Sequence, residues 1–412
     1  MVQSFKRRCA RLVSAVCLAA LVASTAACAA PAKSPLERAA HGNNVFAVRI
    51  YLDQARLHPG KNVFLSPFSL SMAFGMVYGG SRGATAQQLA SVFSFDSAAS
   101  TADQGLGALS DALTARARRG RYALSVANGL WLANDLDLNA AFVGLIKKCF
   151  HGGLTRVSFS KVEAVCQQIN GTVSRLTHNK IRDILTPGDL TPSTRLVLAN
   201  AVYFKAAWAM GFSARRTEQQ PFYTTATRSK PVALMHREDE LAYCRAKGLQ
   251  IVGIPYVNND LSLVVLVPDQ REGLKGLERS LTAAKLTEWM KRLSLREVKL
   301  WLPRFKLESG FRIEKQDARR LGVPLAWSDL ADFEGVCREP IKIGLAVHKA
   351  FVEVNEVGTE ATASTGIAVV RKGEVPAKPP EVPLVRADHP FMFAIRDNHT
   401  GTIIFVGRLL AP

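Results

Sequence analysis

The sequence predicts an α+β fold in one large domain, and three observations support this. The chain has 412 residues, of which 48% are hydrophobic, so it can bury a substantial core. Segments with helix signals come early and segments with strand signals dominate later, an order typical of α+β folds rather than of alternating βαβ units. No repeat, low-complexity run or Gly/Ser linker divides the sequence into parts.

Three early segments carry helix signals. The stretch "SPLE" (residues 34–37) is typical of a capping box with proline at the first helical position. The stretch "SPFSLSMAFGMVYGG" (residues 66–80) is apolar on nearly all sides, which predicts a buried helix that ends near Gly79. Thr85 and Gln88 are spaced to open a third helix in "TAQQLASVF".

Later segments carry strand signals. The runs "LVLANAVYF" (residues 196–204) and "LSLVVLVPD" (residues 261–269) have the length and β-branched content of strands buried on both faces. The stretch "REVKLWLPRFKLES" (residues 296–309) alternates between apolar and polar side chains, which indicates one buried face. Near the end, "FMFAI" and "TIIFVGRLL" flank the turn-forming "RDNHTG" and predict a hairpin.

The first 27 residues predict a signal peptide. Four cations between residues 6 and 11 precede the apolar run "LVSAVCLAALVA", which is too short to span a bilayer comfortably. We expect cleavage before Cys28, export to the periplasm, cell surface or extracellular medium, and a short N-terminal segment of residues 28–40. The ending Ala-Ala-Cys28 also resembles a bacterial lipobox, so lipidation of Cys28, and membrane anchoring through it alone, is one outcome. Ordinary cleavage that yields a soluble product is the other.

The net charge is strongly positive, and the basic residues are densest in one short stretch. The formal charge is +19, and removal of the four leader cations leaves about +15, which favours polyanions as non-specific partners. The densest cluster, "RARRGR", is a candidate polyanion site made of Arg116, Arg118, Arg119 and Arg121. Its alternative is a solvated helix end, where cations suit the helix dipole, and no interleaved aromatic residues support base stacking.

Sequence motifs do not assemble a catalytic or metal site. The stretch "SFSK" (residues 158–161) fits S-x-x-K but lacks the partner motifs that the chemistry requires. Histidines show no ligand spacing, and the four cysteines that follow Cys28 are scattered without a CxxC pair, which favours buried free thiols. We therefore expect no enzymatic activity, no cofactor and no metal.

The stretch "EVNEVGTEATASTGIAVVRKGEVPAKPP" (residues 353–380) is unusual because it is neither a short polar connector nor a bulky strand. Every second residue from Thr359 through Ala361, Ala363 and Thr365 is small or β-branched, the pattern of a strand with one inward face. Alanine, serine and glycine are nevertheless weak strand formers. The segment could thus be a strand in one state and a mobile loop in another, and a flexible connector is the alternative.

Within this stretch, "VHKAFVEVNEVGTEATAST" closely resembles the hinge of serpins. Three further segments resemble serpin motifs in the same order, namely "NVFLSPFSLSMAFGMVYGGSRGATAQQL", "LVLANAVYFKAAWAMGF" and "HPFMFAIRDNHTGTIIFVGRLLAP". The resemblance implies a single serpin domain at residues 41–412, with an N-terminal helical portion, large mixed β-sheets and an exposed reactive centre loop at about residues 356–383. It also implies a monomer.

The family mechanism implies a protease inhibitor of the inhibitory type that acts as a suicide substrate. In serpins a serine protease cuts the loop, whose N-terminal part then inserts into the main sheet and drags the acylated protease along. If a dozen residues each gain about 1 kcal/mol, insertion releases on the order of 10 kcal/mol, so the uncut form is metastable. A non-inhibitory serpin that serves as a binding or carrier protein is the alternative.

The resemblance also assigns roles to single residues. The hinge residues are Glu356, Gly358, Thr359, Glu360, Ala361, Ala363 and Thr365. The shutter, a polar network beneath the sheet where it parts, comprises Ser66, Ser69, Asn200 and His348. Trp208 matches the aromatic residue of the breach, where the loop first enters.

In inhibitory serpins the scissile bond lies 17 residues along from the hinge glutamate inclusive, and the same count from Glu356 ends at Lys372. The reactive bond is thus expected at Lys372-Gly373, with Arg371-Lys372 as the alternative, and a basic residue here implies a trypsin-like serine protease that forms a covalent complex. The segment before "HPF" is longer than in typical serpins, and alignment through "KPPEV" would move the bond nearer to Pro376 or Lys378.

Overall fold

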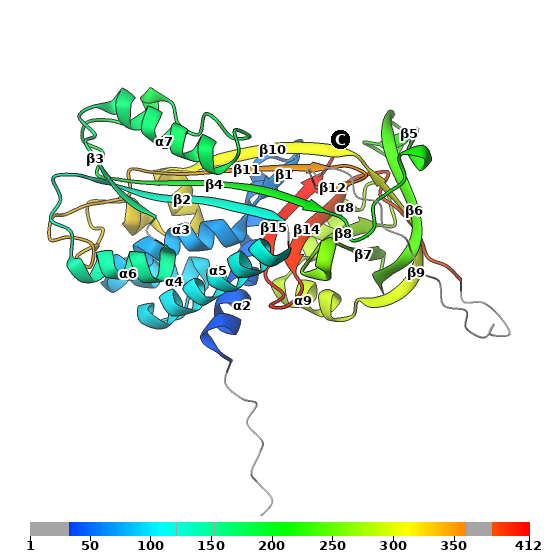
Figure 1. The fold of residues 1–412 in the computed structure, drawn as a ribbon, viewed down its shortest axis with the longest axis horizontal. Helices are drawn as coiled ribbons and strands as arrows, with labels where there is room; N and C mark the ends of the chain where they lie inside the picture. Colours follow the sequence, from blue (N-terminus) through cyan, green and yellow to red (C-terminus); the bar gives the residue numbers. More distant parts are fainter. Residues whose placement is uncertain (1–32, 121, 152, 360–380) are drawn as a thin grey trace, which may run out of the picture. The chain divides into compact units, whose positions relative to one another are not determined.

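The computed structural model describes residues 33–120, 122–151, 153–359 and 381–412, and residues Pro35–Pro412 form one compact unit. Its main sheet has the strand order β10-β11-β12-β4-β2-β3 (Figure 1). These strands are β2 (Ala123–Ala133), β3 (Leu154–Val157), β4 (Leu196–Ala207), β10 (Phe305–Ile313), β11 (Leu345–Val354) and β12 (Gly358–Thr359). The parallel pair β11 and β4 lies at the centre of this sheet, so separating the two strands would open the sheet in its middle.

A second sheet has the order β1-β15-β14-β8-β7-β6-β9-β13, with β5 paired to β6. Its strands are β1 (Val63–Leu65), β5 (Glu218–Tyr223), β6 (Ser229–Ala246), β7 (Leu249–Pro255), β8 (Leu261–Pro268), β9 (Ser294–Pro303), β13 (Leu384–Arg386), β14 (Phe391–Asp397) and β15 (Ile403–Leu409). The predicted terminal hairpin is confirmed as the antiparallel pair β14 and β15. These two strands are buried along most of their length, which explains their nearly continuous apolar sequence.

Helices cover both faces of the main sheet, with α3 on one side and α7 on the other (Figure 1). The α-helices are α2 (Pro35–Leu57), α3 (Pro67–Gly80), α4 (Gly83–Phe93), α5 (Ala99–Gly120), α6 (Ala140–Phe150), α7 (Val162–Leu176), α8 (Leu274–Ser280), α9 (Ala283–Lys291) and α10 (Lys315–Leu321). Short 3-10 helices span Pro187–Asp189, Ala214–Arg216, Val257–Asn259 and Pro324–Trp327. The predicted α+β class is confirmed.

The buried helix predicted after Ser66 is confirmed as α3. Ser66 has extended backbone angles, and its hydroxyl accepts a hydrogen bond from the Ser69 N–H, which satisfies one of the free donors at the helix start. Every residue of α3 except Gly79 is buried, as its apolar sequence predicts. Because this helix lies under the main sheet, its capping serines are placed directly beneath the central strands.

The predicted start of the third helix is wrong. Helix α4 begins at Gly83, two residues before Thr85, and its N-cap is Arg82. The Thr85 hydroxyl instead accepts a hydrogen bond from the Asp332 N–H, and the Gln88 side chain accepts one from Leu325 N–H. Both side chains thus satisfy backbone donors of a distant segment rather than those of their own helix, a use that local spacing cannot predict.

Candidate functional site

The chain reverses direction after β11 through a turn built by Asn355. The Asn355 Oδ1 atom accepts hydrogen bonds from the N–H groups of Val357 (3.0 Å) and Gly358 (3.3 Å), and the Asn355 N–H donates to the Gly358 carbonyl. An asparagine side chain that caps the backbone two residues on is a recognised turn device. The turn sends the next two residues, β12, back between β11 and β4.

Thr359 is the last residue described before the loop, and it is fully buried where β11 and β4 part. It lies opposite Val354 on one side and Ala206 on the other. Its hydroxyl lies 2.7 Å from the hydroxyl of Tyr256. The Tyr256 ring stacks on Trp208 with centroids 4.6 Å apart, and the Trp208 Nε1–H donates to the Asn355 carbonyl at 2.9 Å. Trp208 thus lies beside the turn that leads into β12, at the end of the main sheet where β11 and β4 part.

Glu356 is held by charge at the start of the hinge. Its carboxylate accepts hydrogen bonds from Arg304 Nε at 2.7 and 2.8 Å and from the Thr217 hydroxyl at 2.6 Å. Burial alone would raise the pKa of Glu356, but the hydrogen bonds from Arg304 and Thr217 outweigh it and lower that pKa. Glu356 therefore stays ionised at neutral pH. Its ion pair fixes the hinge to Arg304, the residue directly before β10.

Gly358 sits where only glycine fits. A Cβ atom at this position would lie 2.1 Å from the Ala206 carbonyl oxygen and 2.7 Å from the Ala207 Cα atom, both of which belong to the backbone of β4. Backbone atoms cannot shift as a side chain can, so any larger residue would push the chain out of the sheet. The glycine in the hinge motif is therefore required by close approach of two strands.

Below Thr359, β11 and β4 pair directly in parallel, from Leu345 opposite Val197 to Phe351 opposite Tyr203. In this register His348 lies opposite Asn200, and their side chains are hydrogen-bonded through His348 Nδ1 and Asn200 Oδ1. Asn200 also donates to Asn128, which lies opposite it on β2. A line of polar side chains therefore crosses three central strands of an otherwise apolar sheet.

The two serines of α3 complete this network. The Ser69 hydroxyl donates to Asn200 Oδ1 at 2.8 Å, and Asn200 Nδ2 donates to the Ser69 carbonyl at 3.1 Å. The Ser66 N–H donates to His348 Nε2 at 3.1 Å. Ser66, Ser69, Asn200 and His348, the four residues expected at the shutter, thus lie in one buried cluster. Each buried polar group finds a partner there, as burial of an amide requires.

His348 is neutral in this cluster. Because an N–H can only donate, the bond from Ser66 requires an unprotonated Nε2, and the proton resides on Nδ1, which donates to Asn200. Complete burial lowers the pKa of His348 to about 3. The hydrogen bond between His348 and Asn200 therefore depends on the pairing of β11 and β4, because opening the sheet would separate the two side chains.

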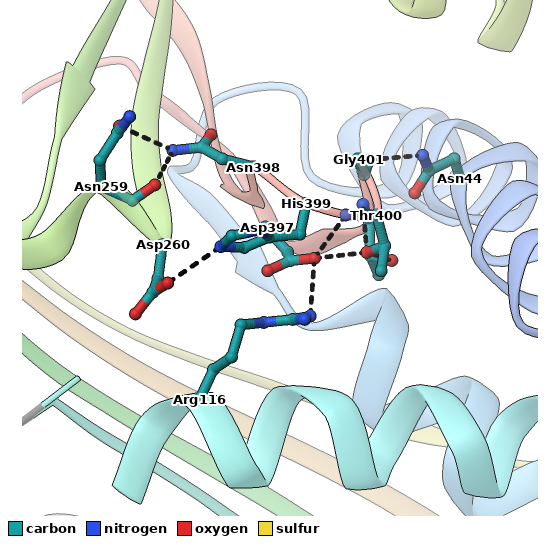
Figure 2. A network of polar contacts seen from close by, with 10 residues as sticks. Asn44, Arg116, Asn259, Asp260, Asp397, Asn398, His399, Thr400 and Gly401 are labelled. Atoms are coloured by element: carbon teal, nitrogen blue, oxygen red, sulfur yellow. Dashed lines mark hydrogen bonds and ion pairs between the residues drawn. The ribbon is translucent and has the colours of Figure 1, made fainter. Parts of the chain in front are cut away.

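The candidate polyanion cluster is not a free row of cations. Arg116, the first residue of the cluster, already has a partner, because its Nη2 atom lies 3.0 Å from the fully buried Asp397 (Figure 2). The Thr400 hydroxyl and N–H also donate to the same Asp397 oxygen. Arg118 and Arg119 remain exposed at the end of α5, and Arg121 lies outside the described residues. Arg116 thus ties α5 to the β14–β15 turn.

Several expected site residues lie outside the described part of the chain. These are Cys28, Glu360, Ala361, Ala363, Thr365, Arg371, Lys372 and Gly373. Cys149, Cys166, Cys244 and Cys337 are buried free thiols, as expected. In the described ranges, no His, Cys, Asp and Glu side chains are grouped to hold a metal ion. Within those same ranges, no helix has the length and apolarity needed to cross a membrane.

Sequence reasoning missed five residues that complete the site: Asn128, Thr217, Tyr256, Arg304 and Asn355. Asn128 carries a detectable signal, because it is a polar residue within the apolar strand sequence of β2, as Asn200 is within β4. Arg304 and Tyr256 carry no such signal in the sequence. Each lies in an ordinary strand-rich segment, and only the tertiary structure brings it into contact with the hinge.

Comparison with known proteins gives consistent results. A family model described as Serpin (serine protease inhibitor) matches residues 41–412. The chain is 37% identical to Serpin B6 of Pongo abelii over 90% of this chain and 99% of that protein. It is also 37% identical to the leukocyte elastase inhibitor of Homo sapiens, over 92% of this chain and 100% of that protein. A crystal structure of human thyroxine-binding globulin complexed with its ligand matches with a TM-score of 0.82 and 25% identity, over 92% of this chain and all of that one.

Proposed function

The chain belongs to the serpin family of protease inhibitors and is not an enzyme, and we propose that it traps a trypsin-like serine protease as a suicide substrate. The observation that carries the proposal is the position of Gly358 and Thr359. These two residues already form a strand between β11 and β4 at the end where the two strands part. After cleavage, the rest of the loop would continue this strand.

The register of the short strand defines how far insertion would go. Thr359 lies opposite Ala206 of β4, and continuing the antiparallel register would place residue 369 opposite Leu196, the first residue of that strand. Small residues at alternate positions, Ala361 and Ala363 among them, would enter without overpacking the sheet. A complete strand therefore requires cleavage after residue 369.

We propose Lys372-Gly373 as the reactive bond, with Arg371-Lys372 as the alternative. Either bond leaves the whole of residues 360–369 free to insert after cleavage, and either would place a cation in the specificity pocket of the protease. A basic side chain suits a pocket that carries an acid, which is the reason for proposing a trypsin-like target.

A binding or carrier function is the second candidate. It is favoured by the similarity to thyroxine-binding globulin, whose structure was solved with a bound ligand. Against it stand the small side chains of the hinge, Thr359 among them, because non-inhibitory serpins typically carry charged or bulky residues or proline there.

The remaining expectations concern location and partners. We propose that the chain is exported through its N-terminal leader, with Cys28 as the candidate lipid anchor, and that it acts as a monomer. The relatives named above are vertebrate proteins, so the bacterial type of leader is supported only by the leader sequence itself. Of the polyanion site, Arg118 and Arg119 are the described residues that still face solvent.

The test is to mix the protein with trypsin, separate the products on a denaturing gel and determine the mass of the released C-terminal peptide. A band that contains both proteins, resistant to denaturant, is expected, and a peptide that begins at Gly373 identifies the bond. If cleavage occurs without a complex, the cut protein is heated. A large rise in its unfolding temperature means that the strand inserts and trypsin is the wrong target, whereas no rise overturns the inhibitor function.

A further inference from the structure

A cavity of about 660 Å³ lies beside α8, and no hinge or shutter residue lines it. Its walls come from distant parts of the chain: the C-terminal end of α2 with the loop after it, the turn after β5, helix α8 with the residues before it, Pro390 before β14, and the end of β15 with the chain terminus. We call it the α8 cavity. Its volume is within the range of small-molecule sites, roughly 300–1,000 Å³.

One part of the α8 cavity is apolar. Ala55, Leu274 and Pro390 are buried side chains that line it, and Leu410 is half-buried beside them. Gly276 of α8 also lines the cavity, and a Cβ atom built there meets no atom within 4 Å. A side chain added at Gly276 would therefore meet no protein atom at its first carbon.

The acidic residues of the cavity already have partners. Glu278 accepts hydrogen bonds from Arg408 Nη1 and from the Tyr51 hydroxyl, each at 2.8 Å. Glu272 accepts a hydrogen bond from the Ala226 N–H at 3.2 Å. Arg408 in turn donates to backbone carbonyls of the α2 loop as well as to Glu278. Glu278 and Arg408 thus offset each other's charge, and Glu272 is the one remaining carboxylate of the cavity lining.

Two cations of α8 have no carboxylate partner among the described residues. Lys275 and Arg279 are one helical turn apart, so they lie on the same face of α8, and both are exposed. Across the ranges that the structure describes, neither forms an ion pair. Arg271 is held nearby, with its guanidinium 3.3 Å from the centroid of the Tyr223 ring and one nitrogen donating to the Ala226 carbonyl. The cavity lining carries four cations against two carboxylates.

We propose that the α8 cavity is a binding site for a small amphipathic anion, a molecule with one apolar body and one carboxylate or sulfonate group. The apolar body would lie against Leu274, Pro390 and Leu410. The anionic group would lie between Lys275 and Arg279, neither of which is paired with a carboxylate in the described part of the chain. This inference is independent of the inhibitory function, because it uses no residue of the hinge, the shutter or the loop.

The test is a fluorescence titration of the intact protein with 8-anilinonaphthalene-1-sulfonate, alongside the uncharged analogue N-phenyl-1-naphthylamine. We expect saturable binding of one sulfonate probe per chain and weaker binding of the uncharged probe. The double variant Lys275→Glu/Arg279→Glu should weaken sulfonate binding about tenfold or more, since two charge-assisted contacts are lost. Gly276→Trp should block both probes by filling the apolar part.

A matched control carries the same change of charge elsewhere. Arg175→Glu/Lys247→Glu alters two exposed cations that do not line the cavity, and it should bind the sulfonate probe as the parent does. Competition with decanoate or with naphthalene-2-sulfonate distinguishes an acyl from an aromatic body. The proposal is overturned if the parent shows no saturable binding, if the control weakens binding as much as the α8 variant, or if Gly276→Trp, folded by circular dichroism, binds normally.

Discussion

His348 of β11 and Asn200 of β4 lie directly opposite each other across the central parallel pair, and their buried side chains are hydrogen-bonded. Continuing the register of Thr359 between these strands would place Thr365 between His348 and Asn200. Thr365 is six residues beyond Thr359, so its side chain would point to the same face of the sheet. An inserted loop would therefore break one hydrogen bond and offer a hydroxyl to both partners.

The first prediction concerns this hydroxyl. Thr365→Val keeps the shape of the side chain but removes the hydroxyl, so His348 and Asn200 would lack a partner in the cut form. We expect the cut form to lose about 1–3 kcal/mol of unfolding free energy while the uncut form is unchanged, as measured by guanidinium titration of both. Thr362→Val, in the opposite phase, is the control. Equal losses in cut and uncut protein would refute the predicted position of Thr365.

The second prediction concerns charge in the hinge. Thr359→Arg would place a cation in a fully buried position beside Tyr256, at a cost that insertion cannot recover. We expect proteases to cut this variant at the parent's bond and to escape, so that the denaturant-resistant complex is lost. Thr359→Ser keeps the hydroxyl and should retain the complex. A stable complex with the arginine variant would show that Thr359 does not lead insertion.

The third prediction concerns pH. An unfolded histidine gains a proton below pH 6.5, whereas His348 stays neutral in the folded protein down to about pH 3. The unfolded state therefore binds more protons in this window, and the unfolding free energy of the uncut protein should fall as pH drops, by up to about 1.4 kcal/mol per pH unit.

The control for this pH prediction is the variant His348→Gln. Burial also lowers the pKa of His236, so the measured quantity is the difference in slope between the parent and His348→Gln from pH 7 to pH 5. His236→Gln gives the separate contribution of that residue. Identical slopes for the parent and His348→Gln would contradict a neutral His348 in the shutter.

The fourth prediction concerns the ion pair of Glu356 and Arg304. The pKa of Glu356 is lowered, so its contribution to stability is present above pH 4.5 and is lost as pH falls through the folded pKa. Because Arg304 is half exposed, a double-mutant cycle with Glu356→Gln and Arg304→Gln should give a coupling of roughly 1 kcal/mol at pH 7. The exposed pair Arg245 and Asp269 serves as the comparison. A coupling that persists unchanged at pH 3 would argue against a charge interaction.

The fifth prediction concerns Gly358. Gly358→Ala would bring a Cβ atom onto the backbone of β4, and we expect β12 to leave the sheet and the uncut protein to lose roughly 1–3 kcal/mol of stability. Hydrogen exchange at the Trp208 amide, which donates to Val357, should increase. Gly144→Ala in α6, where no atom lies within 4 Å, is the control and should be neutral or slightly stabilising. An unaltered exchange rate would contradict the prediction, because it would show that the backbone of β4 shifts to accept the added Cβ atom.

Much of the fold could be predicted because its determinants lie within a few residues of one another. Ser66 caps α3 through the N–H of Ser69, three residues away. The apolar runs of β4 and β8 are long enough to be predicted as buried strands. The turn residues after Asp397 close the last hairpin. The resemblance of the hinge motif to serpins pointed to the family in the same way, through contiguous residues.

Only the tertiary structure decided which distant groups meet. Asn200 by itself predicts some buried partner, but sheet register selects His348 and Asn128, and the placement of α3 adds Ser69. Arg116 reads as an exposed cation and is instead bound to Asp397. Arg304 and Glu356 are far apart in the chain and meet at 2.7 Å. Local sequence determines strand, helix and turn because those depend on neighbouring residues, whereas a partner across a sheet depends on the register and packing of the whole chain.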